Sequence, residues 1–333
     1  MPLRTIDVGA GPALFDIVSF ARRGPSRTTR LSPMQVAQVS RTVRRVPEVV
    51  VKVSGGGTSA KGVVAHLNYL IRRREFEIET NDGKRVQGRA SVKNLVEDWD
   101  LDLDAAESQS GYRGTPGRKP TKLVHNIVLS MPAGTSPTGL LAASQAFARE
   151  QFALKNRYAM VLHTDQPHPH VHLVVKAMGE QGQRLNIRKA TLREWRSEFA
   201  RHLRAEGIAA NATDRFARGV TKPRKPDGIY WANEEGRSTH IQEKRESVMA
   251  ELLAGDNRVE PTKANLLKAR QSVEQGWRAV SDALRSDGKQ DLAAEVNRFL
   301  KQMPPPHTER ELIATELLGR QPPTPTRERP IAR

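Results

Sequence analysis

Residues 163–172 read His-Thr-Asp-Gln-Pro-His-Pro-His-Val-His and hold four of the nine histidines of this 333-residue chain. The residues on either side predict two strands, 157–163 and 169–178, joined by a tight turn. Side chains two residues apart on a strand point to the same side of a sheet, so His170 and His172 should share one face. The turn would bring His163 over that pair. Three neutral imidazoles placed in this way predict a metal site with open positions for water or a phosphate oxygen.

Three neighbouring residues are weaker candidates for the same site. Asp165 suits either a plain turn position or a carboxylate that orients a ligand histidine or accepts a proton. His168 suits a supporting or loop position. His125 lies on a further predicted strand, 122–131, where it could support the site, although a lone histidine on a strand is usually a hydrogen-bonded structural residue.

The charge balance points to a polyanionic partner. The chain carries 54 Lys and Arg against 37 Asp and Glu, a net charge of +17. Nucleic acid is the first candidate and an anionic membrane surface the weaker one. The absence of cysteine excludes disulfides, thiolate metal sites and a cysteine nucleophile. Apolar runs are too short for a membrane span, and the N-terminus lacks the apolar segment of a secretory signal.

Basic residues are concentrated in residues 181–225, which contain twelve Lys and Arg against four acidic residues. This strip is the best candidate for contacts with a nucleic-acid backbone, because Lys and Arg neutralise phosphates. Its candidate DNA-binding residues are Arg188, Lys189, Arg193, Arg196, Arg215 and Arg218. A solvated helix face is the alternative interpretation.

The remaining pattern predicts a helix at 60–73, a hairpin around residues 81–83 and a polar loop at 91–121. Helical periodicity then dominates residues 240–302. The predicted division begins with a basic flexible arm over 1–46, with one short helix from Pro33 to Arg45, and a folded domain over 47–225 that contains the histidines. A mostly helical extension over 226–302 and a Pro-rich disordered tail over 303–333 follow.

The histidine stretch resembles motif III of conjugative relaxases in the HUH endonuclease superfamily, and most closely their mobilisation and T-DNA border-nicking branch. The resemblance covers roughly residues 49–220 and includes Ser-Gly-Gly-Gly at 54–57, His-Leu-Asn-Tyr-Leu at 66–70 and the segment 211–220. A His-x-His pair alone is a weak signal, whereas the full spacing with its upstream motifs is a strong one.

This resemblance implies an α+β fold, with a central antiparallel sheet flanked by helices and followed here by a helical C-terminal extension. It also implies a tyrosine nucleophile in the first motif, which corresponds to Tyr69. Rolling-circle replication initiators share the histidine pair but usually carry their tyrosine after it. Here Tyr69 precedes the pair, and this order favours a relaxase.

The implied activity is metal-dependent nicking and rejoining of one DNA strand at an origin of transfer, through a 5′-phosphotyrosine intermediate that initiates conjugation. Phosphate chemistry favours Mn or Mg, and imidazole ligands leave Zn, Ni and Co as alternatives. The implied partners are single-stranded DNA, accessory nicking proteins and a type IV secretion coupling protein, in the cytoplasm of a bacterial donor cell, with export to the recipient. A metal-stabilised, non-enzymatic DNA-binding mobilisation protein and a replication initiator are the alternative functions.

Overall fold

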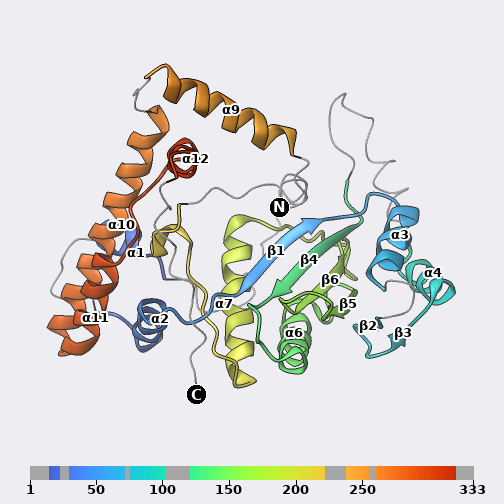
Figure 1. The fold of residues 1–333 in the computed structure, drawn as a ribbon. Helices are drawn as coiled ribbons and strands as arrows, with labels where there is room; N and C mark the ends of the chain where they lie inside the picture. Colours follow the sequence, from blue (N-terminus) through green and yellow to red (C-terminus); the bar gives the residue numbers. More distant parts are fainter. Residues whose placement is uncertain are drawn as a thin grey trace, which may run out of the picture. The chain divides into compact units, whose positions relative to one another are not determined.

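The computed structural model describes residues 15–22, 30–71, 76–101, 121–221, 238–255 and 260–319. The described residues fall into two compact units (Figure 1). The first unit spans residues 46–212, and the second combines 15–45 with the residues from 213 onwards. The first unit therefore ends at 212, whereas the sequence predicts a boundary near 225.

The first unit is built on a six-stranded sheet in which every neighbouring pair is antiparallel, with the order β1-β4-β6-β5-β2-β3. Its strands are β1 (Val50–Gly55), β2 (Ile78–Thr80), β3 (Arg85–Val86), β4 (Val124–Ser130), β5 (Tyr158–His163) and β6 (His170–Lys176). The β2–β3 pair is the hairpin that the sequence predicts. Together with the flanking helices, this sheet confirms the predicted α+β class.

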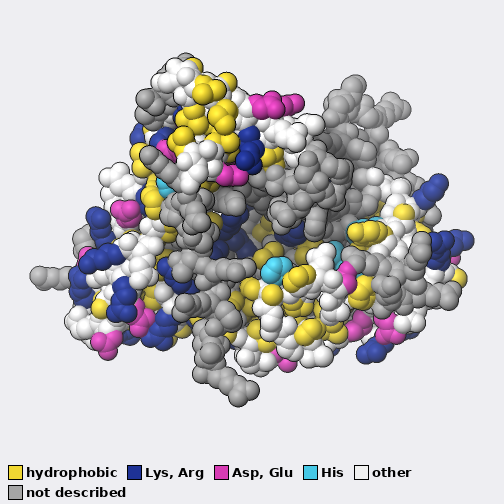
Figure 2. Space-filling model, viewed as in Figure 1, with side chains coloured by type: hydrophobic (Ala, Val, Ile, Leu, Met, Phe, Trp, Pro, Cys, Tyr) yellow, Lys and Arg dark blue, Asp and Glu magenta, His cyan; other side chains and the backbone are white. Residues whose placement is uncertain are grey.

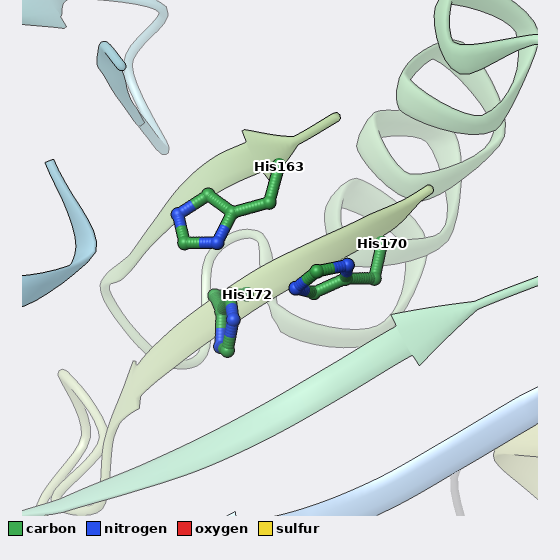
Figure 3. Close-up of side chains that lie close together, drawn as sticks. All are labelled: His163, His170 and His172. Carbon is green, nitrogen blue, oxygen red and sulfur yellow. The ribbon is translucent and has the colours of Figure 1, made fainter. Parts of the chain in front are cut away.

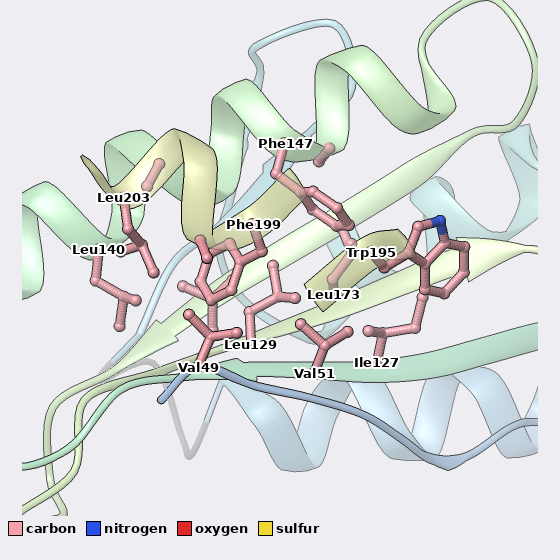
Figure 4. Packing of buried hydrophobic residues seen from close by; sticks show 14 of the residues in the cluster. Val49, Val51, Ile127, Leu129, Leu140, Phe147, Leu173, Trp195, Phe199 and Leu203 are labelled. Carbon is pink, nitrogen blue, oxygen red and sulfur yellow. The ribbon is translucent and has the colours of Figure 1, made fainter. Parts of the chain in front are cut away.

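One face of the sheet is covered by α6 (Pro137–Phe152) and α7 (Lys189–Ala205). Aromatic side chains of the two helices pack edge to face, with the Phe147 and Phe199 ring centroids 5.8 Å apart (Figure 4). They rest on strand residues such as Ile127 and Leu173, which are completely buried. This cluster holds β4 and β6 in place, and β6 carries two of the predicted metal ligands.

The other face is covered in part by α3 (Ala60–Leu70) and α4 (Arg89–Asp98). Ser59 begins α3 by accepting a hydrogen bond from the Gly62 backbone N–H. Leu67 and Leu70 of α3 are fully buried and pack with Val161 of β5 in a second core cluster. Helix α4 lies largely where the sequence predicts a polar loop, residues 91–121, because its exposed charged residues mask the helical spacing of the buried Val92 and Val96.

The second unit is helical. Its elements are α1 (Ile17–Arg22), α2 (Pro33–Val43), the short 3-10 helix η2 (Phe216–Arg218), α9 (Thr239–Leu253), α10 (Pro261–Ser286), α11 (Gln290–Lys301) and α12 (Glu309–Leu317). Trp277 lies at the centre of its core, where its indole N–H donates to the Ala217 carbonyl at 2.7 Å. None of the helices among the described residues combines the length and apolar character needed to cross a bilayer.

Two segments differ from the sequence expectation. Helix α2 agrees with the helix predicted from Pro33 to Arg45, but α1 and α2 are packed into the second unit and do not form a flexible arm, because Ile17 and Val39 bury their side chains in its core. Helix α12 forms inside the segment expected to be a disordered tail, where Thr308 supplies a capping box. The rest of that arm and tail, residues 1–14, 23–29 and 320–333, lies outside the described residues.

Replacement of Phe199 by alanine should lower the free energy of unfolding of the first unit by about 3–5 kcal/mol, because it opens a cavity in the core under β4 and β6. Urea denaturation followed by circular dichroism measures this change. Leu154→Ala is the matched control, since Leu154 is 93% exposed and its truncation should change stability by less than about 0.5 kcal/mol. Equal effects of the two variants would contradict the packing described above.

Candidate metal centre and nuclease site

Three histidines from two neighbouring strands come together on one face of the sheet (Figure 3). His163 of β5 lies directly opposite His170 of β6, and His172 follows two residues later on the same side. Each ring offers a nitrogen within 4.8 Å of the others, and the ring centroids are 4.7–5.2 Å apart. The strands thus assemble the cluster that the sequence spacing predicts.

Backbone carbonyls fix the tautomers of two of these rings. His163 Nε2 lies 2.8 Å from the Leu70 carbonyl oxygen, and His170 Nδ1 lies 3.0 Å from the His168 carbonyl oxygen. A carbonyl oxygen only accepts, so the nitrogens facing these carbonyls carry the protons. Nδ1 of His163 and Nε2 of His170 are therefore the nitrogens with lone pairs. Such hydrogen bonds orient metal-binding imidazoles and strengthen them as ligands.

The cluster is enclosed on one side and open on the other. His163 is 1% exposed and His170 9% exposed, whereas His172 is only half-buried. The Phe76 ring packs against His163 at a centroid distance of 4.6 Å. Three neutral imidazoles with their nitrogens this close are a donor set that suits a divalent transition metal ion, with positions left for further ligands on the open side.

The end of α3 reaches this cluster, because the carbonyl that binds His163 belongs to Leu70, the last residue of the helix. Tyr69 is its neighbour in sequence, and the tyrosine side chain is 64% exposed. The His66 ring stacks on the Tyr69 ring at 6.5 Å, with 22° between their planes. Partial burial lowers the pKa of His66 below its ordinary value, which disfavours the charged form of this stacking partner.

Comparison with known proteins agrees with this arrangement. Residues 78–208 match the family described as "Relaxase: MobA/VirD2-like, nuclease domain". The chain carries a MobA/VirD2-like relaxase nuclease domain. The matched segment of this relaxase domain contains the three histidines and Asp165. It begins after α3, so the role of Tyr69 stays a prediction.

Similar curated proteins carry the name T-DNA border endonuclease VirD2. Those of Rhizobium radiobacter and Agrobacterium fabrum are each 27% identical over 191 residues, which is 53% of this chain and 44% and 41% of the relatives. That of Rhizobium rhizogenes is 26% identical over 189 residues, 52% of this chain and 42% of the relative. The chain thus spans less than half the length of these relatives. No solved structure matches the chain.

The relaxase domain places Asp165 and His168 in the connection between β5 and β6, and both are exposed. Asp165 is two residues from His163 in the sequence, and its part in the site stays a prediction. His168 supports the cluster through its backbone carbonyl, which accepts from His170. This contact involves the backbone of His168 and not its side chain.

His125 is not beside the cluster. On β4 it is Val128 that lies opposite His172, and residues 125 and 128 point to opposite faces of the sheet. Burial, Lys122 and Arg184 together lower the pKa of His125 on its own face. The prediction that His125 supports the metal ligands is thus wrong for this relaxase domain, because strand alternation turns it away.

Four of the six predicted DNA contacts are separated from the histidines within the first unit. Arg188, Lys189, Arg193 and Arg196 lie at the start of α7, which covers the opposite face of the sheet. Arg215 directly precedes η2 and Arg218 is its last residue, in the second unit. These six residues stay predicted phosphate contacts, but the four on α7 do not line the histidine cluster.

A second group of possible ligands consists of Glu150, Glu198 and His202, at the contact between α6 and α7. Arg201 already binds both carboxylates, with N–O distances of 2.5 Å to Glu150 and 2.7 Å to Glu198. Burial acts to raise the pKa of Glu150, but the hydrogen bonds and charges of Arg201 and His202 together outweigh it and lower the pKa. A guanidinium thus supplies the cation here, and the group is an ion-pair network rather than a metal centre.

Proposed function

We propose that this protein nicks and rejoins one strand of DNA at an origin of transfer, with Tyr69 as the nucleophile. The observation that carries the proposal is the histidine cluster at the end of α3, within a segment similar to relaxase nucleases. The net charge of +17 agrees with a nucleic-acid substrate. The VirD2 relatives are named for cutting T-DNA borders, and we extend strand cutting to this chain.

The proposed reaction is a transesterification at phosphorus. The Tyr69 phenol oxygen forms a bond to the phosphorus, and the bond from phosphorus to the 3′-oxygen breaks. The phenol proton passes to Asp165 or to water, and the departing 3′-oxygen takes up a proton. Because the phenol has a pKa near 10 in its ordinary state, a base is needed to assist its attack. One phosphodiester replaces another, so rejoining is the reverse step and needs no external energy source.

His163, His170 and His172 would hold a divalent metal ion, with Mn or Mg preferred for phosphate chemistry and Zn, Ni or Co as alternatives. When bound, such an ion neutralises charge on the phosphate oxygens and lowers the barrier to attack. The protein's own part is to keep the imidazoles oriented: the Leu70 and His168 carbonyls hold two rings in fixed tautomers.

Further partners follow from the same proposal. After nicking, the strand attached to Tyr69 would be delivered to a type IV secretion coupling protein, with accessory nicking proteins assisting at the origin. The donor-cell cytoplasm is the compartment in which this would occur. The second unit, with its separate helical core, is available for such protein contacts.

A covalent-capture experiment tests the proposal. The protein is incubated with Mn²⁺ and a single-stranded DNA library that has a randomised centre and a 3′-end label, and the products are separated in SDS. Label that migrates with the protein, survives boiling and disappears after protease digestion is the expected result. A 5′-end label should instead appear on a shortened free strand. DNA binding without any adduct would contradict the proposal and favour the non-enzymatic mobilisation protein.

A further inference from the structure

The face of the sheet that carries the histidines continues beyond them across β4 to β1. Residues paired directly across antiparallel strands point to the same side. One row joins Lys52 to Val128 and Val128 to His172. A parallel row joins Val50, Ser130, His170 and His163. Lys52 therefore shares a face and a row with a metal-ligand candidate, although 120 residues separate them in the sequence.

Within the part of the chain that the structure describes, helices of the first unit cover only part of this face. Val161 of β5 and Val174 of β6 are buried beneath α3 and α4. Towards β1 the face becomes accessible, since Val50 is 44% exposed and Lys52 is half-buried. Figure 2 likewise shows histidine side chains at the surface of the side viewed in Figure 1. Val50 and Lys52 of β1 and the half-buried Ser130 of β4 thus form a partly accessible strip beside the histidine cluster, with the buried Val128 lying between Lys52 and His172.

We propose that Lys52 binds a phosphate of the DNA strand beside the histidine cluster, so that the strip over β1 and β4 is the floor on which the strand lies. The inference rests on the proposed function and names a contact for that same site. Adjacent strands are about 4.8 Å apart, which puts the Cα atoms of Lys52 and His172 roughly 10 Å apart. The four-carbon stem of a lysine can extend its ammonium over Val128 towards a phosphate at the cluster.

The positive charge of Lys52 is the reason to expect a phosphate contact at this position. Imidazoles that bind a metal ion are uncharged, and the four predicted phosphate contacts of α7 lie on the other face. Lys52 supplies a positive charge on the histidine face itself. A lysine on an edge strand such as β1 can also serve simply to prevent strand-to-strand aggregation. The two roles differ in whether DNA binding depends on the lysine.

The test uses the full chain with Tyr69→Phe as background, so that the DNA is not cut. Binding of a fluorescein-labelled single-stranded oligonucleotide is followed by anisotropy over a range of NaCl concentrations. Lys52→Met should weaken binding and make the slope of log K against log salt less negative by about 0.7, the change for one lost phosphate contact on a single strand. Lys52→Arg should restore most of the affinity.

Lys61→Met is the matched control. Lys61 is an exposed lysine of the same unit, on the side of α3 that faces Lys93 and Glu97 of α4. Its removal should leave the salt slope unchanged. If Lys52 only protects the sheet edge, Lys52→Met will leave the salt slope unchanged, as Lys61→Met does, and will differ from it only by increased aggregation. This outcome would overturn the inference.

Replacing single phosphates by neutral methylphosphonates locates the contact. In the Tyr69→Phe protein, the replacement at one position along the oligonucleotide should lower the affinity about tenfold, as expected for the loss of a charge-assisted hydrogen bond. In the protein that carries both Tyr69→Phe and Lys52→Met, the replacement at the same position should lower the affinity by less than about twofold. If adducts form normally and this coupling is missing, the Lys52 contact fails and the proposed function stands. If the coupling is present and no adduct forms, the Lys52 contact stands and the proposed function fails.

Discussion

Tyr69→Phe is expected to abolish the covalent protein–DNA adduct, with a loss of nicking of at least about 10³-fold, while DNA binding is retained. The substitution removes only the phenolic oxygen, which is the proposed attacking atom. Because the Tyr69 side chain is 64% exposed, the loss of its hydroxyl should leave the fold unchanged. The measurement is single-turnover nicking of a labelled single strand, with anisotropy for binding and circular dichroism for folding.

Tyr158→Phe is the matched control for this experiment. Tyr158 begins β5 in the same unit, but it is 4% exposed and lies in the core on the other face of the sheet. Burial raises the pKa of Tyr158, which further disfavours its use as a nucleophile. Its variant should form the adduct at nearly the normal rate. An adduct that persists in Tyr69→Phe would remove Tyr69 from the mechanism.

His172→Ala should lower the affinity for Mn²⁺ by at least about 10²-fold and reduce nicking by about 10³-fold. The substitution removes one of three nitrogens that lie within 4.8 Å of one another, and a metal site with two protein ligands holds its ion poorly. Isothermal titration calorimetry measures Mn²⁺ binding directly, without dependence on activity. His172 is the least buried member of the cluster, so its truncation disturbs packing less than that of His163.

His168→Ala separates a role in metal binding from the mere presence of histidine in this stretch. Its backbone carbonyl, which accepts from His170, is kept in the variant. Mn²⁺ affinity should therefore stay within about twofold of the parent protein. An equal loss in His168→Ala and His172→Ala would mean that the ligands differ from the three rings that converge in the structure.

The local sequence determined the strands and the histidine cluster. The pair His170 and His172 shares a face because strand side chains alternate with a period of two, and a short turn suffices to add His163. The same local reasoning found α3, whose buried Leu67 and Leu70 recur at helical spacing. Both features depend on residues close together in the chain, so no knowledge of the fold was needed.

Tertiary structure decided which distant residues meet that cluster. The register of β1, β4 and β6 brings Lys52 into line with His172, and it turns His125 to the far face. The docking of α3 sets the Leu70 carbonyl against His163, 93 residues later in the chain. Register and docking follow from long-range packing of whole faces, and such packing leaves no periodic trace in the neighbouring sequence.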